Sequence, residues 1–316
     1  MVKSKNLDRV CNSWLCAWGS IVLVLLLQLF EPVLTHADNS YIPPEQIKIS
    51  TPVYEPVLER FSPRLGEYEF DVSWQGISAA WGTLVVKHEG GRYRVTTKAQ
   101  TYSGIEIFYK LRYRAEGLLS SYNLHPISSI MDQTENSKRK VAKIDFRPDG
   151  TIHSVRSKVG KWTKVTNFKP DNFTLDPFSA AFLARSLDWK LGEAKRFDVW
   201  NGKTRYEITL TAGKEDEIKY EGSKRKVWII SPVVKNLSSP HKNGKLRDAR
   251  IFVTQDRERE LVRIESEVFI GTVTTRVTGF KPAPHPVPAT RLAMRGATAG
   301  KSSGFIGPRT APRRLQ

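Results

Sequence analysis

The strongest constraint on the fold is an alternation of apolar and polar residues that recurs between residues 65 and 280. It is clearest in four runs: EYEFDVSW (67–74), GIEIFYKLRYRAEG (104–117), TRYEITLTAG (204–213) and ELVRIESEVFIG (260–271). Successive side chains of a β-strand point to opposite faces of a sheet, so this period indicates strands with one buried and one solvated face. Such strands are typical of antiparallel sheets. The sequence therefore predicts a mainly β chain built from antiparallel strands.

One segment departs from the alternation and predicts a helix over residues 177–187. Asp176 is a suitable N-cap, and Pro177 suits the first helical position, where its missing N–H does no harm. Phe178 and Phe182 are spaced so that they share one face of such a helix. We therefore expect one short helix that packs this apolar face on the sheet.

The first forty residues have the pattern of an export signal. Three cations precede an apolar run over residues 14–30, and small residues end the segment at Ala37. We predict a signal peptide over residues 1–37 that is cleaved after Ala37, and hence a periplasmic location. The alternative is an uncleaved anchor in the inner membrane, because the apolar run approaches the length that spans a bilayer. Cys11 and Cys16 both lie in this segment, so the cleaved chain would have no disulfide and no thiolate ligand.

Composition divides the remainder of the chain into three parts. Residues 38–64 are rich in proline and have no sustained period, which predicts an extended Pro-rich leader to the domain. Residues 65–280 contain the alternating runs and form the predicted β-rich domain. Residues 281–316 are rich in Pro, Gly, Ala and Ser and carry seven Lys or Arg without an acidic residue, so we expect a disordered basic tail.

The chain has a formal net charge of +18 at pH 7, and the pentapeptide SKRKV occurs twice, at 137–141 and 223–227. In the envelope, a basic surface meets anionic lipids, lipopolysaccharide or cell-wall polymers rather than nucleic acid, and it favours association with a membrane surface. We therefore expect a cationic rim for an anionic ligand, which consists of Lys110, Arg112, Arg114, Lys138, Arg139, Lys140, Lys224, Arg225 and Lys226. The alternative is that lysines at these strand starts only keep strand edges solvated.

The sequence lacks the motifs of common hydrolases. It has no G-x-S-x-G, no H-E-x-x-H and no phosphate-binding glycine loop, and its histidines do not have the spacing of metal ligands. We therefore predict no catalytic residue, no cofactor and no metal site. A glycan hydrolase with an aspartate pair is the enzymatic alternative, and its candidates are Asp71, Asp145, Asp176, Asp198 and Asp256. Structural roles at turns and caps are the simpler interpretation for such aspartates.

Seven stretches of the chain carry a family resemblance. In order they are YEFDVSWQGISAAWGTLVV, YRAEGLLSSYNLHPISS, AKIDFRPDGTI, LDPFSAAFLAR, FDVWNGKTRYEITL, FVTQDRERELVRIE and GTVTTRVTGF. Over residues 65–280 the chain thereby resembles a bacterial family of exported proteins, the domain of unknown function 3108. The resemblance implies an envelope protein with one strongly curved, mostly antiparallel sheet in the form of a half-barrel or a barrel-like structure. It implies no activity, so it transfers no functional residue.

A curved sheet can leave aromatic side chains on its concave face, where they would line an apolar groove beside the cationic rim. The candidates are Trp74, Trp81, Trp200 and Trp228. Burial in the core is the alternative for each of them, since aromatic side chains bury large areas and suit strands.

Together these features predict a non-enzymatic periplasmic protein that binds an amphiphilic or anionic envelope component. The alternative is a scaffold that recruits envelope proteins through its basic tail. The identity of the ligand and the oligomeric state stay open.

Overall fold

The computed structural model describes residues 41–240, 247–268 and 271–284. The predicted signal peptide, and the predicted disordered tail beyond residue 284, lie outside the described residues. The helices and strands described below belong to one compact unit that ends at Ala283.

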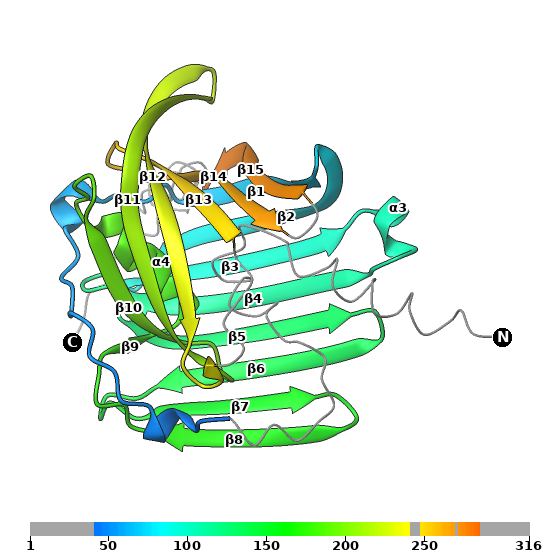
Figure 1. Cartoon of the computed structure of the whole chain (residues 1–316), viewed down its shortest axis with the longest axis vertical. Helices are drawn as coiled ribbons and strands as arrows, with labels where there is room; N and C mark the ends of the chain where they lie inside the picture. Colours follow the sequence, from blue (N-terminus) through cyan, green and yellow to red (C-terminus); the bar gives the residue numbers. More distant parts are fainter. Residues whose placement is uncertain (1–40, 241–246, 269–270, 285–316) are drawn as a thin grey trace, which may run out of the picture. The chain divides into compact units, whose positions relative to one another are not determined.

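Fifteen strands in the described part of the chain form one sheet (Figure 1). They are β1 (Gly66–Trp74), β2 (Ile77–Glu89), β3 (Arg92–Thr101), β4 (Leu111–Ser120), β5 (Pro126–Glu135), β6 (Lys138–Phe146), β7 (Ile152–Lys158), β8 (Trp162–Phe168), β9 (Thr174–Leu175), β10 (Ala194–Trp200), β11 (Arg205–Tyr220), β12 (Ser223–Asn236), β13 (Arg247–Thr254), β14 (Leu261–Val268) and β15 (Gly271–Pro282). Neighbouring strands are antiparallel except β9 and β10, which are parallel. This confirms the predicted mainly β fold with a mostly antiparallel sheet.

The sheet has two arms that meet where its first and last strands pair. Across the sheet the strand order is β8-β7-β6-β5-β4-β3-β2-β1-β15-β14-β13-β12-β11-β10-β9, so β8 and β9 are the edges and the sheet is not closed. The sheet curls so that the arm with β10–β13 lies over the arm with β3–β8 (Figure 1). Trp200 at the end of β10 packs against Phe168 at the end of β8, with ring centroids 5.1 Å apart, so the two arms share a core.

Helix α4 (Pro177–Ser186) lies between the arms and confirms the predicted helix. It contacts β4 on one arm and β10 on the other. Its N-cap is Asp176, whose carboxylate accepts a hydrogen bond from the Ser179 N–H at 2.7 Å. Phe178 and Phe182 join the core of β1–β5, whereas Leu183 joins the core of β10–β14, so one short helix fills the space between two apolar faces.

Gly117 on β4 allows this close packing. A Cβ atom at this position would lie 2.4 Å from the ring of Phe178, well inside van der Waals contact. The helix can therefore approach β4 only where the strand has no side chain.

Residues 41–64 form no strand but lie against the domain, with two short 3₁₀ turns, η1 (Pro44–Gln46) and η2 (Leu58–Arg60). The Ile42 N–H donates to the Ser238 carbonyl at 2.8 Å, and the Arg64 guanidinium donates to the buried Glu260 carboxylate at 2.7 Å. The sequence predicts an extended segment here, and the structure adds that both of its ends are hydrogen-bonded to residues that flank strands, Ser238 after β12 and Glu260 before β14.

The start of β4 differs from the sequence expectation. The alternating run from residue 104 suggests a strand that begins near Ile105, but residues Ser103–Glu106 form the short helix α3 and β4 begins at Leu111. The Ile105 and Glu106 N–H groups both donate to the Tyr102 carbonyl, which closes a helical turn. The chain must reverse direction between β3 and β4, and this turn makes the reversal. As a result, Ile107 is 82% exposed instead of buried on the sheet.

Candidate anion-binding site

The nine cations of the predicted rim are divided between the two arms of the sheet. Three are on or next to β4 and three are on β6, in the same arm, whereas three are on β12 in the other arm. The two SKRKV copies thus fall on different arms, because strands that are similar in sequence occupy distant positions in the sheet order. Binding of an anionic ligand by these residues stays a prediction.

Several of these cations already have carboxylate partners. Arg225 of the second SKRKV copy donates to Asp256 at 2.7 Å and lies 3.7 Å from Glu258. Arg112 donates to Glu106 at 2.5 Å, and this carboxylate is also 3.9 Å from the Lys110 ammonium. The charges of Arg225 and Arg112 are thus largely balanced within the protein.

The first SKRKV copy is divided by the alternation of β6. Arg139 lies on the outer face and donates to Asp132 at 2.9 Å. Lys138 and Lys140 lie on the opposite face, which they share with the buried Ala142. Only two cations of this pentapeptide therefore face the inside of the curved sheet.

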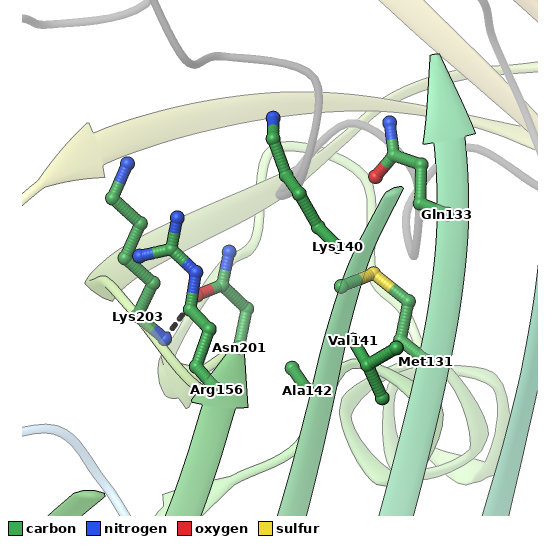
Figure 2. A pocket seen from close by; sticks show the side chains of 8 residues that line it. All are labelled: Met131, Gln133, Lys140, Val141, Ala142, Arg156, Asn201 and Lys203. Carbon is green, nitrogen blue, oxygen red and sulfur yellow. Dashed lines mark hydrogen bonds between the residues drawn. The ribbon is translucent and has the colours of Figure 1, made fainter. Parts of the chain in front are cut away.

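These two lysines meet cations that the sequence pattern did not single out. Lys140 pairs in register with Lys158 on β7, and the turn after β7 adds Lys161. A small pocket beside them, with a cavity of about 20 Å³, is lined by Lys140, Arg156 and Lys203 (Figure 2). We call Lys138, Lys140, Arg156, Lys158, Lys161 and Lys203 the cation cluster. In the sequence, the basic stretch RSKVGK at 156–161 points to these cations. Only the pairing of β6 with β7 shows that this stretch lies beside Lys138 and Lys140.

The loop between β10 and β11 brings Lys203 to this pocket from the other arm. Asn201 accepts hydrogen bonds from the N–H groups of Lys203 and Thr204, at 3.0 and 2.8 Å, which fixes a tight turn. Gly202 within the turn has a φ of 88°, and a Cβ atom there would lie 3.3 Å from Ala142 on β6. A glycine therefore allows the turn to approach the opposite arm.

The charges of the cluster perturb one another. Loss of hydration, and then the positive charges of Lys161, Lys138 and Lys140, lower the pKa of Lys158. Burial lowers the pKa of Arg156. Glu135 approaches the cluster, with its carboxylate 3.3 Å from the Lys140 ammonium. An anion placed among these cations would relieve their mutual repulsion, so the arrangement is suited to bind a negatively charged group.

The four candidate tryptophans do not line one groove. Trp200 is fully buried, and Trp228 is 8% exposed with the Arg259 guanidinium 4.4 Å above its ring. Trp74 packs against the core of β1–β5, and Trp81 is 39% exposed on β2. A second pocket, beside Phe178, has a cavity of only about 10 Å³. Lipid-sized ligands occupy pockets of several hundred Å³, so neither pocket can hold an acyl chain.

The candidate aspartates have structural partners in the described part of the chain. Asp198 binds Arg205, Asp176 caps α4 and Asp256 binds Arg225. Asp71 accepts from Ser78 at 3.2 Å, and Asp145 lies 3.4 Å from the Lys143 ammonium.

The described residues contain no group of three or more His, Cys, Asp or Glu residues placed to hold a metal ion. No helix among them has the length and apolar character needed to span a membrane.

Comparisons with known proteins concern the family and the fold. A family model described as "Protein of unknown function (DUF3108)" matches residues 69–278. No curated protein matches the chain. A beta-barrel-like protein of domain of unknown function DUF1849 from Brucella abortus is 10% identical, with a TM-score of 0.47 over 70% of this chain and 99% of that one. A candidate lipoprotein from Parabacteroides distasonis is also 10% identical, with a TM-score of 0.28 over 70% of this chain and 98% of that one.

Proposed function

The chain belongs to the DUF3108 family of proteins of unknown function, and from this premise we propose that it is a non-enzymatic envelope protein that binds an anionic envelope component. The single observation that carries the proposal is the cation cluster, in which residues of β6, β7 and the β10–β11 loop converge on one pocket. Loss of hydration, and then the positive charges of Lys161, Lys138 and Lys140, lower the pKa of Lys158. A bound anion would offset the repulsion among these cations.

The size of the pocket narrows the class of ligand. A cavity of about 20 Å³ accepts roughly one water-sized group. One oxygen of a phosphate or carboxylate group fits this space, with the rest of the group and of the larger molecule outside. We therefore propose that the ligand is recognised by an anionic head group, such as a phosphate of a phospholipid or of lipopolysaccharide, and not by an acyl chain.

A titration of the full chain with inorganic pyrophosphate tests the proposal. The double variant Lys140→Ala/Lys158→Ala should bind pyrophosphate about ten-fold or more weakly, because charge-assisted hydrogen bonds contribute about 1.5–3 kcal/mol each. The matched control is Lys224→Ala/Lys226→Ala, which removes the same charges from the other SKRKV copy and should leave the affinity unchanged. Equal losses in both variants would show that only net charge matters, and the proposal would then fail.

The envelope location rests on the leader pattern and has its own test. We expect the protein recovered from the envelope of its host to begin at Asp38, since small residues precede this position. Intact-mass measurement distinguishes the cleaved chain from the full one. A full-length chain in the cytosol would contradict the proposed location.

A further inference from the structure

Four chain reversals lie at the same end of the arm that contains β1–β8. They connect β1 to β2 (75–76), β3 to β4 (102–110), β5 to β6 (136–137) and β7 to β8 (159–161). In an antiparallel meander every second connection returns to the same end, so the strand order places these four side by side.

Backbone hydrogen bonds join these reversals into one edge. The Tyr102 N–H donates to the Ala79 carbonyl at 3.1 Å, next to the start of β2. The Asn136 N–H donates to the Lys110 carbonyl at 2.8 Å, and the Val159 N–H donates to the Arg139 carbonyl at 3.0 Å. We call this edge the hairpin rim. It runs without interruption from the β1–β2 turn to the β7–β8 turn.

The hairpin rim exposes large apolar side chains at three of its reversals. The exposed fractions are 62% for Ile77, 82% for Ile107, 71% for Phe108, 53% for Val159 and 42% for Trp162. Single exposed apolar residues are common on protein surfaces, but a row of them along one edge marks an interaction surface.

Cations lie between these apolar tips. Lys110 is exposed beside Phe108, Lys138 begins β6, and Lys161 precedes Trp162. The Glu106 carboxylate in the same edge accepts a hydrogen bond from Arg112 and lies 3.9 Å from the exposed Lys110 ammonium. Apolar tips alternating with lysines complement a surface that combines an apolar interior with anionic head groups, which is the chemistry of an anionic bilayer. Tryptophan at the boundary between apolar and charged groups is typical of such interfaces.

We propose that the hairpin rim docks on the surface of an anionic phospholipid bilayer. Ile107 and Phe108 enter the head-group region, while Lys110, Lys138 and Lys161 contact lipid phosphates. The proposal goes beyond the anion site, because its apolar tips do not line the pocket. Lys138 and Lys161 belong both to the hairpin rim and to the cation cluster. Docking of the rim would therefore place the cation cluster next to the membrane.

Amide hydrogen exchange of the full chain tests the docking locally. Vesicles of equal parts phosphatidylglycerol and phosphatidylcholine should slow the exchange of residues 102–110 and 159–161, whereas vesicles of phosphatidylcholine alone should have little effect. The control region is the β4–β5 turn at the other end of the same arm, where Tyr122 is 77% exposed. Protection of both ends, or of neither, would overturn the proposal. Attachment through another part of the chain would not protect 102–110 selectively.

Variants separate the rim from the pocket. Ile107→Ser/Phe108→Ser should lower the partition of the chain onto the anionic vesicles about ten-fold and remove the protection at 159–161, because it removes the inserted apolar area. Tyr122→Ser, which replaces an equally exposed aromatic residue, should change neither measurement. Pyrophosphate binding should persist in both variants, so failure of the docking proposal is distinguishable from failure of the anion site. A double variant that partitions like the unchanged chain would refute the docking.

Discussion

The guanidinium of Arg205 and the carboxylate of Asp198 form a two-point ion pair in the interior, with N–O distances of 2.6 and 3.0 Å and side-chain exposures of 1% and 0%. The remaining Arg205 nitrogen donates to the carbonyls of Pro44 and Ile47, at 3.1 and 3.0 Å. One buried cation therefore links β10, β11 and the Pro-rich segment that precedes the domain.

We expect Arg205→Met to lower the free energy of unfolding by about 3–5 kcal/mol, because it leaves the Asp198 carboxylate buried without its partner charge. Urea unfolding measures the change, and limited proteolysis should show earlier cleavage within residues 41–51. The control is Lys48→Met in the same Pro-rich segment. It removes an exposed ion pair, in which the Lys48 ammonium lies 3.2 Å from the Asp171 carboxylate, and should leave the free energy of unfolding unchanged. Equal stability of both variants would contradict the linking role of Arg205.

Gly117→Ala should also destabilise the domain. Its Cβ would lie 2.4 Å from the ring of Phe178, so α4 must move away from β4, at an expected cost of about 1–3 kcal/mol. Gly213→Ala is the matched control in β11, where the nearest atom, the Ile229 carbonyl oxygen, would be 3.7 Å away. In thermal unfolding, the midpoint temperature should fall for Gly117→Ala and stay unchanged for Gly213→Ala. A similar loss in both would mean that alanine is simply disfavoured in these strands.

Much of the fold could be predicted from local patterns, because alternation and capping are written in adjacent residues. Helix α4 begins at Pro177 behind its predicted cap, Asp176, and β1 covers the run 66–74. The pairing of β1 with β15 could not be predicted, since it joins segments about 200 residues apart through backbone bonds that carry no sequence signal. The helical turn of α3 was missed because three alternating residues suit a strand and a turn equally well.

The site was predictable only in part, because strand pairing brings together residues that are far apart in the sequence. Lys138 and Lys140 were identified as cations for an anionic ligand, but Lys158 and Lys203 reach them only through strand pairing and the curl of the sheet. The period of two was sufficient to place Arg139 on the other face, where it binds Asp132. Adjacent cations in a strand should therefore be divided by face before they are combined into a site.

Trp200→Ala distinguishes a core role from a ligand role. Trp200 is fully buried against Phe168, so its loss should cost about 3–5 kcal/mol in the free energy of unfolding. Trp81→Ala removes a tryptophan that is 39% exposed and should cost much less. Urea unfolding of both variants measures the difference. Full stability of Trp200→Ala would reopen the interpretation of this side chain as part of a groove.

The affinity of the cluster for an anion should begin to fall at a lower pH than it would if all its lysines had the ordinary pKa. The reason is that reduced hydration and its lysine neighbours lower the pKa of Lys158. Lys158 then loses its charge at a lower pH than an isolated lysine. Titrations with sulfate, whose charge is constant in this range, measure the affinity as a function of pH. Lys158→Arg keeps its charge throughout and should extend binding to higher pH. Identical pH profiles would exclude a contribution from Lys158.

Asp176 should make the stability of the domain fall as the pH rises from about 4 to 6. Burial raises the pKa of this carboxyl to about 6 from 3.8, although hydrogen bonds from Ser179 and Ser129 lower it in part. Between these two values the folded state holds a proton that the unfolded state has lost, so raising the pH favours unfolding. Above pH 6 the penalty is constant at about 3 kcal/mol, because a tenfold difference in proton affinity between the two states corresponds to about 1.36 kcal/mol.

Asp176→Asn removes this penalty and keeps an oxygen that can accept the hydrogen bond from the Ser179 N–H. At neutral pH the variant should be more stable by up to about 3 kcal/mol, and the two stability curves should converge in acid. The control variant, Asp149→Asn, should change the stability at neutral pH in the opposite direction. Hydrogen bonds from Thr151 lower the pKa of the exposed Asp149, so Asp149→Asn should reduce stability at neutral pH and again converge in acid. Urea unfolding across this pH range tests both. A neutral-pH loss of stability in Asp176→Asn would mean that the cap requires the charge, in spite of its burial.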